Sequence, residues 1–220
     1  MRHSAARSFL TAMIAGLLGV SCGAQEEPAP ESAATMPEPE AQATPAAKQT
    51  VAPFEFTSTD YWDSGITFRV TSPNSGSINE VTITPSGLEI DNSPVTVEVD
   101  GTVTGAEVAD LNFDGSPEIY VYATSAGSGS YGSLIAYGTN NRKSMSPIYL
   151  PPVVDHPEAS KGYMGHDEFA VVELGLVQRF PIYREGDTNA EPTGGTRQVQ
   201  YKLEAGEAGW VLRPDRVVEY

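Results

Sequence analysis

The sequence predicts a mostly β protein, an antiparallel β-sandwich or barrel-like single domain that follows a disordered tether. Short runs rich in β-branched and aromatic residues support this, because several alternate apolar and polar side chains with a period of two. Turn-forming residues separate the runs. No stretch keeps a helical period beyond about two turns, apart from a short helix that we expect between Pro157 and Lys161.

The expected strands lie within residues 53–220, a length sufficient for one hydrophobic core. Examples are Ile66–Val70, Val81–Thr84, Val95–Val99, Ile119–Thr124, Ser133–Tyr137, Phe169–Glu173 and Gln198–Leu203. Between them lie segments such as Asn-Ser-Gly, Asp-Gly, Glu-Gly-Asp and Gly-Gly, whose residues accept positive φ or form side-chain turns. The sequence shows no internal repeat.

Residues 1–22 are typical of a bacterial export signal. A head with Arg2 and Arg7 precedes an apolar run, residues 9–20, that is too short to span a bilayer as a finished helix. Just after this run stands Cys22, the only cysteine in the chain. It has no partner for an internal disulfide, so it is a free thiol, an intermolecular partner or a modified residue.

The position of Cys22 resembles a bacterial lipobox, in which the cysteine sulfur receives a diacylglyceryl group and becomes part of the new N-terminus. Gly19 departs from that signal, because leucine is usual three residues before the cysteine. An ordinary signal peptide cleaved nearby is the alternative. By analogy with known sorting rules, Gly23 in place of aspartate favours the outer membrane. The resemblance implies a periplasmic protein with a lipid anchor in that membrane.

Residues 23–52 are rich in Ala, Pro, Glu and Thr, with almost no large apolar side chains. Such a segment buries too little apolar surface to offset the entropy lost on ordering, so we expect a disordered linker. It would reach roughly 90 Å in a polyproline conformation and about 30 Å as a flexible coil.

The charge balance is strongly acidic. The chain has 13 Lys+Arg and 29 Asp+Glu, and removing Arg2 and Arg7 with the leader leaves 11 against 29, a formal charge of −18. Nucleic acid and anionic lipid surfaces are therefore not expected as partners, because phosphate contacts need clustered cations. A basic partner would be attracted instead.

The most distinctive segment, residues 125–132, satisfies a Gly-x-Gly-x-x-Gly pattern. A dinucleotide site needs a helix after the glycines, whereas residues 133–137 are expected to form a strand. The lysine, catalytic-loop and metal-binding motifs of a kinase are absent from the sequence, and neither Ser128 nor Ser130 has the flanking glycines of a hydrolase elbow. The pattern therefore does not indicate a nucleotide-binding site or an enzyme.

What remains is a hairpin tip with little side-chain bulk except Tyr131. A narrow loop of this kind can enter a cleft, and a tyrosine supplies a rigid anchor with a polar end. Because the rest of the tip is glycine, serine and alanine, we expect little of the fold to depend on Tyr131. A plain flexible hairpin is the alternative.

The run Ser128-Gly129-Ser130-Tyr131 resembles the Ser-Gly-x-Tyr motif of the PliI family, periplasmic inhibitors of invertebrate-type (i-type) lysozyme. The likeness covers roughly Val108 to Val217, and its specificity lies in the combination of segments. The other segments are Tyr149–Pro152, Gly162–Ala170, Arg179–Tyr183, Gly186–Asn189 and Pro192–Arg197.

The resemblance implies an inhibitor without catalytic activity or a required cofactor, whose Ser128 and Tyr131 hydroxyls meet the catalytic carboxyl groups of the lysozyme. Such an inhibitor protects the peptidoglycan of a Gram-negative bacterium from a host enzyme. The family also suggests a homodimer. Family members are often soluble in the periplasm, so the linker and lipid anchor are departures that concern location.

A second motif has oxygen donors at Asp110, Asn112 and Asp114, followed by glycine, which is how a calcium loop begins. Position twelve is Val121 where an EF-hand requires glutamate, so calcium is expected only in another form, with Glu118 as a ligand. The alternative is an Asp-Gly turn held by its own side chains. This motif supports the alternative function, that of a calcium-stabilised cell-envelope binding module for glycan or protein.

His156 and His166 are the histidines that follow the leader. Their spacing matches no zinc signature, so we do not expect a zinc site. A structural hydrogen bond in a glycine-rich turn is the expected role of His166.

Overall fold

The computed structural model describes residues 51–220. The expected export signal, the lipidation of Cys22 and nearly all of the linker lie outside the described residues. The described residues belong to one compact unit. None of the helices in this part is long and apolar enough to cross a membrane.

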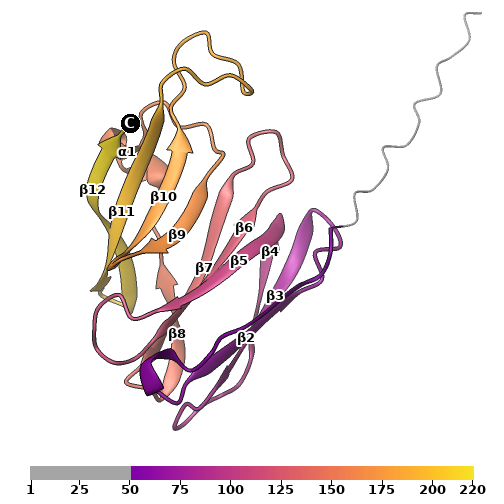
Figure 1. Ribbon diagram of the computed structural model, residues 1–220, viewed down its shortest axis with the longest axis vertical. Coiled ribbons are helices and arrows are strands. Elements are labelled where there is room, and N and C mark those ends of the chain that lie inside the picture. The colour runs from indigo at the N-terminus through magenta and orange to yellow at the C-terminus, as the bar shows by residue number, and fades with distance from the viewer. Residues whose placement is uncertain (1–50) are drawn as a thin grey trace, which may run out of the picture. The chain divides into compact units, whose positions relative to one another are not determined.

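The strands form one four-stranded and one eight-stranded sheet (Figure 1). Their bounds are β1 Phe54–Thr57, β2 Thr67–Ser72, β3 Ile78–Ser86, β4 Val95–Asp100, β5 Thr102–Ala109, β6 Glu118–Thr124, β7 Gly132–Asn140, β8 Ser144–Tyr149, β9 Glu168–Val172, β10 Gly175–Pro181, β11 Thr196–Ala205 and β12 Trp210–Glu219. The helices are the 3-10 turns η1 Tyr61–Asp63 and η2 Val153–Asp155, and the single-turn helix α1 Pro157–Ser160.

The first sheet has the order β1-β2-β3-β4, with every pair antiparallel. Burial alternates along β2 and β3, so one face is apolar and the other carries polar side chains. On the polar face Thr82 and Thr96 are hydrogen-bonded across the strands at 3.1 Å. This alternation is the reason that these strands could be predicted from sequence.

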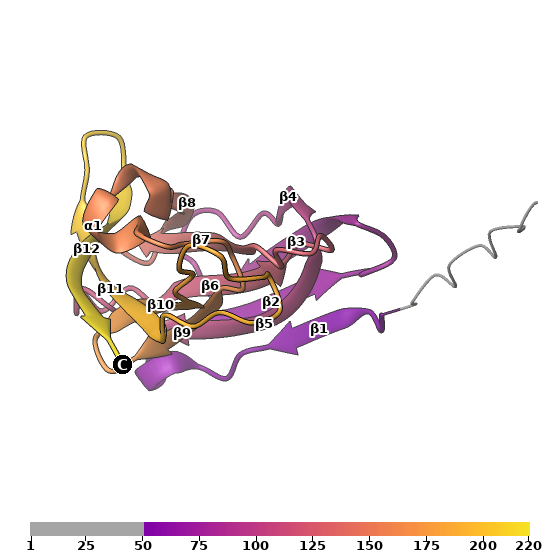
Figure 2. The same cartoon turned by 90° about the horizontal axis from the view of Figure 1, so that it is seen from above.

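The second sheet has the order β5-β6-β7-β8-β12-β11-β10-β9 and curls into a nearly closed barrel. Figure 2 shows β9 and β5 on the same side of the molecule. A side chain bridges the two edges, because Glu107 on β5 accepts a hydrogen bond from the Val171 amide on β9 at 2.9 Å. The same Glu107 oxygen accepts from the Tyr122 hydroxyl at 2.5 Å.

Strand β6 is buried on both faces and joins two hydrophobic cores. Ile119 and Val121 belong to the core between the two sheets. Tyr120 and Tyr122 belong to the core inside the curled sheet, together with Leu176 and Phe180 of β10 and with α1. Because β6 is fixed on both sides, the loops at its two ends are attached to a rigid support.

The mostly β prediction and the short helix at Pro157 are confirmed. One pairing departs from the antiparallel expectation, because β12 runs parallel to β8 with Trp210 opposite Ile148. Strands β1, β5, β8, β10 and β12 were not among the strands named from the sequence.

Candidate functional site

The glycine-serine loop, residues 125–131, joins β6 to β7 (Figure 1). It is closed by its own hydrogen bonds. The Ser125 amide donates to the Tyr131 carbonyl, and the Ser130 amide donates to the Gly127 carbonyl, both at 2.9 Å. The Tyr131 amide donates to the Ser125 hydroxyl at 2.9 Å. These bonds give the loop a defined backbone conformation.

Two other segments hold the tip of this loop from outside. The His166 amide donates to the Gly129 carbonyl at 2.7 Å. The Asn189 side-chain amide donates to the Ser128 carbonyl. His166 and Asn189 are also joined to each other, because the His166 Nε2 and the Asn189 Oδ1 lie 3.2 Å apart. The loop is therefore anchored at its tip, unlike a hairpin that stands alone.

The ring of Tyr131 lies over the loop. A Cβ at Gly129 would stand 2.4 Å from Tyr131 Cε2, so Gly129 leaves room for the ring. A Cβ at Gly165, where φ is +91°, would stand 2.2 Å from the Gly129 carbonyl oxygen, which makes glycine necessary for this close approach.

Tyr131 also contacts the core, which corrects the expectation that the fold gains little from it. Its ring meets Tyr163 edge-on with 5.9 Å between centroids, and Tyr163 meets Phe180 edge-on at 4.7 Å. Tyr131 nevertheless remains 48% exposed. It is therefore both an accessible contact residue and a stabilising one.

The loop presents neutral hydroxyl groups on this fixed backbone. Ser128 is exposed, and Ser130 is half-buried with a φ of +42°, which is uncommon for a residue other than glycine. Serine and tyrosine hydroxyls each donate and accept hydrogen bonds without bringing a charge. The loop can therefore pair with a protonated or an ionised carboxyl group.

Asp167 connects the base of the loop to the interior of the barrel. One of its oxygens accepts from the Gly132 amide at 2.9 Å and from the Tyr163 hydroxyl at 2.7 Å. The other accepts from the Gln178 side chain at 2.6 Å, and Gln178 in turn accepts from the Tyr201 hydroxyl at 2.7 Å. Burial and the nearby Asp167 carboxylate raise the pKa of Tyr163, which keeps its hydroxyl protonated as a donor.

An apolar hollow of about 610 Å³ lies beside the loop. Its lining includes Tyr131, Tyr163, Leu134 and the segment 148–154. Tyr149 and Val154 are exposed there. The loop and the hollow thus form one continuous face.

Comparisons with known proteins do not place the chain in a family. No protein-family model, no curated protein and no solved structure matches it. The likeness to the PliI family therefore has only the short motifs of the chain itself as support. Asp167 and Asn189, which hold the loop, were not predicted as site residues, but both lie in segments that carry that likeness.

At the other end of β6, the structure brings together three of the four predicted metal ligands. Oxygens of Asp110, Asp114 and Glu118 lie within 4.8 Å of one another. Among the His, Cys, Asp and Glu side chains of residues 51–220, these three form the one group that is close enough to share an ion. Asp110 and Glu118 are buried and Asp114 is exposed.

The same loop also satisfies the alternative of a self-stabilised turn. The two oxygens of Asp110 accept from the amides of Asp114 at 3.1 Å and Gly115 at 2.9 Å. Asn112 accepts from the Asp114 amide at 3.1 Å and donates to the Asp114 carboxylate at 3.0 Å. Each carboxylate oxygen keeps a further lone pair, so these bonds are compatible with a bound cation.

Glu118 is the unusual member of this cluster. Burial raises the pKa of its carboxyl group to about 8, and the charges of Asp110 and Asp114 raise it in the same direction. The hydrogen bond from the Leu111 amide, at 2.9 Å, opposes the shift. Near neutral pH, Glu118 therefore holds its proton when no cation is present.

We expect this carboxyl group to make stability fall as pH rises. The folded-state pKa of Glu118 lies above its ordinary value of 4.5, so the protonated carboxyl group adds to the free energy of unfolding. This contribution is complete below pH 4.5 and is lost as the pH rises through about 8. One such group changes the free energy of unfolding by at most about 1.4 kcal/mol per pH unit. Denaturant unfolding of the wild type and of Glu118→Gln in metal-free buffer measures this slope. Identical slopes for both proteins would contradict the assignment.

The two histidines do not form a metal site with the acidic cluster. His166 has a φ of +58°, and its ring hydrogen-bonds Asn189 and stacks near Tyr183 with centroids 6.3 Å apart. This is the structural role expected for it. His156 caps η2 and precedes α1, and its buried Nε2 has no partner within residues 51–220.

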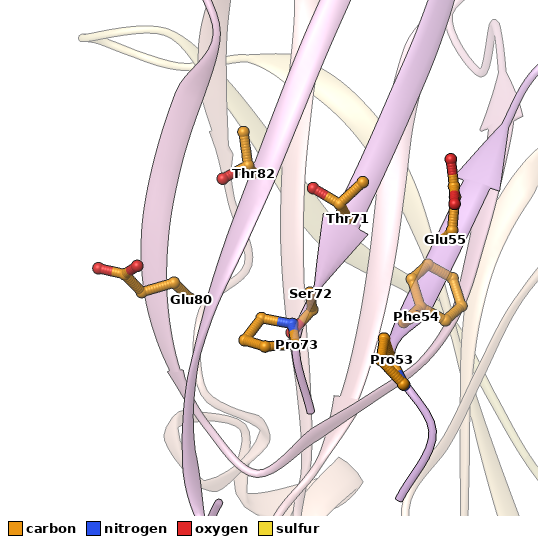
Figure 3. Close-up of a pocket in the computed structure, with 8 residues that line it drawn as sticks. All are labelled: Pro53, Phe54, Glu55, Thr71, Ser72, Pro73, Glu80 and Thr82. Carbon is orange, nitrogen blue, oxygen red and sulfur yellow. The ribbon is translucent and has the colours of Figure 1, made fainter. Parts of the chain in front are cut away.

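A further hollow of about 350 Å³ lies over the outer face of β1, β2 and β3. Figure 3 shows Glu55 and Glu80 on opposite sides of it, with Thr71 and Pro73 between them. Glu55 is paired with Arg69 at 2.7 Å. We assign no function to this hollow because its side chains do not converge on one point (Figure 3).

Proposed function

We propose that the protein inhibits i-type lysozyme by inserting the loop Ser128–Tyr131 into the active-site cleft. The observation that supports this most is the anchoring of the loop, because His166 and Asn189 fix the backbone carbonyls of Gly129 and Ser128. A loop that is ordered before binding loses less entropy on entering a cleft.

The chemistry of a lysozyme suits such a loop. A glycosidase of this kind uses one protonated and one ionised carboxyl group, so its cleft offers both a donor and acceptors. The hydroxyls of Ser128 and Tyr131 can pair with either group, whereas an inserted carboxylate would repel the ionised one. The surplus of acidic residues accelerates the encounter with a basic enzyme. The proposal requires neither catalysis by this protein nor a cofactor.

Lysis assays with invertebrate-, chicken- and goose-type lysozymes in parallel test this function. We expect inhibition of the invertebrate-type enzyme at concentrations that leave the other two active. Full activity of every i-type enzyme at saturating protein would exclude the proposed function.

We also propose that the protein is anchored in the outer membrane through a lipid on Cys22. Replacing Cys22 by serine is then expected to move the protein from the membrane fraction to the soluble periplasmic fraction. Fractionation followed by immunoblotting measures this change. A wild-type protein that is already soluble would show that the leader is an ordinary signal peptide.

The acidic cluster favours one second candidate, a calcium-stabilised envelope module that binds glycan or protein. Asp110 and Asp114 place like charges beside the buried Glu118 carboxyl group, and a cation would relieve their repulsion and favour ionisation of Glu118. Calcium present at a hundred times its Kd should add about 2.7 kcal/mol to the free energy of unfolding. Thermal melting with chelator and with millimolar calcium measures this gain, and Asp110→Asn should remove it. Superimposable melting curves would count against calcium binding.

A further inference from the structure

Three aromatic rings lie together on the surface, outside the glycine-serine loop, residues 125–131, which is the proposed inhibitory loop. We call Tyr61, Trp62 and Phe113 the aromatic patch. The rings of Tyr61 and Trp62 are 4.9 Å apart with 24° between their planes, and those of Trp62 and Phe113 are 6.5 Å apart with 27° between planes. Trp62 is 69% exposed and Phe113 is 54% exposed. Two loops from different sheets thus combine to present apolar rings to solvent.

The backbone at these positions is held in an unfavourable conformation. Trp62, Asp63 and Phe113 have φ angles of +51°, +55° and +58°. Bulky side chains such as those of Trp62 and Phe113 rarely adopt such angles, so holding these residues there costs free energy. Because Trp62 and Phe113 are exposed, the burial of these two rings does not offset that cost. Strained residues of this kind are commonly found at binding sites.

The aromatic patch and the inhibitory loop lie at opposite ends of β6. Phe113 lies in the loop that precedes β6, whereas Ser128 and Tyr131 lie in the loop that follows it. The seven residues of β6 separate the two by roughly 20 Å. In Figure 1, η1 lies at the lower left of the view, away from the β6–β7 loop. A partner at the patch would therefore leave the inhibitory loop accessible.

The surroundings of the patch are acidic. The segments 58–66 and 110–117 contain four aspartates and no lysine or arginine. Asp63 and Asp114, the neighbours of Trp62 and Phe113 in the chain, are exposed. One arginine reaches this region, since the Arg142 Nε donates to the Gly115 carbonyl at 2.9 Å. Exposed aromatic rings beside carboxylates complement a planar cation.

We propose that the aromatic patch binds an arginine side chain of a basic partner polypeptide. The guanidinium group is planar, stacks on aromatic faces and pairs with carboxylates such as Asp63. A lysine ammonium group is more strongly hydrated and stacks less well. The ligand class follows from ring exposure and local charge, and it does not depend on the function of the inhibitory loop.

The probes are an arginine hexapeptide and a lysine hexapeptide, titrated into the protein by calorimetry at physiological ionic strength. We expect the arginine peptide to bind more tightly than the lysine peptide. Trp62→Ala should weaken arginine-peptide binding about tenfold. Phe113→Leu keeps an apolar side chain but removes the aromatic ring, so it should also weaken binding of the arginine peptide. Tyr220→Ala removes another tyrosine that is 70% exposed and should bind like the wild type.

Melting temperatures separate loss of binding from loss of fold, and Asp63→Asn should reduce the dependence of binding on salt. Equal affinity for both peptides, unchanged in Trp62→Ala, would indicate general attraction to an acidic protein and would overturn the proposal. A chitin oligosaccharide is the third probe. If the oligosaccharide binds in a Trp62-dependent manner and the arginine peptide does not, the patch is a saccharide site and the proposal is wrong.

Discussion

Replacing Tyr131 by alanine is expected to raise the inhibition constant for an i-type lysozyme about thirtyfold or more, because a central aromatic anchor is typically worth 2 kcal/mol or more. The structure adds a smaller effect on stability. Loss of the edge-on contact with Tyr163 should lower the free energy of unfolding by about 1 kcal/mol. Inhibition kinetics and denaturant unfolding of the same preparation measure the two effects.

Two further variants identify the part of Tyr131 that acts. Tyr131→Phe keeps the ring over Gly129 and removes the hydroxyl, so it should retain the stability of the wild type and lose part of the inhibition. Ser144→Ala, outside the loop, should inhibit normally. If Tyr131→Ala inhibits as well as the wild type, the loop does not act by entering the cleft. A loss of inhibition that only accompanies unfolding would make Tyr131 a structural residue.

Asp167→Ala should have the largest effect on stability, a loss of about 3 kcal/mol or more in the free energy of unfolding. The substitution leaves the Gly132 amide, the Tyr163 hydroxyl and the Gln178 side chain without their acceptor. Each buried polar group left without a partner costs about 1 to 3 kcal/mol. Urea denaturation monitored by circular dichroism measures the loss.

Asp187→Ala is the matched control, because Asp187 also accepts several hydrogen bonds, from Arg184 and Thr193, but these bonds are exposed to solvent. Water can replace those bonds, so its loss should be clearly smaller. Equal destabilisation by Asp167→Ala and Asp187→Ala would show that the Asp167 network does not support the loop as described.

Strands with regular alternation could be predicted from the sequence, and irregular ones could not. Ile119–Thr124 was expected and lies within β6. Strand β5 was missed because Gly105 sits at a bulge between β5 and β6 and interrupts the pattern. Strand β12 was missed because Pro214 and several charged residues lie within it, and a bulge at Gln200 and Tyr201 accommodates them.

The site was predictable in its residues and not in its geometry. The sequence nominated Ser128–Tyr131 by composition, because only one bulky side chain stands among small ones. It gave no sign that the His166 amide would meet the Gly129 carbonyl, since the two are far apart in the chain and no local pattern specifies their pairing. The acidic cluster was predictable because Asp110, Asp114 and Glu118 are close in sequence, whereas the burial that raises the pKa of Glu118 depends on the tertiary fold.

The parallel pairing of β12 with β8 affects how the protein folds. The hairpins β2–β3, β6–β7 and β10–β11 can form from neighbouring segments, but the two halves of the eight-stranded sheet join only when positions 148 and 210 meet. Bringing together residues so distant in the chain costs loop-closure entropy before any contact compensates it. The turn at 162–167, which anchors the glycine-serine loop, lies inside the segment closed by this step. We therefore expect the glycine-serine loop to become ordered late in folding, after β6 and β7 have paired.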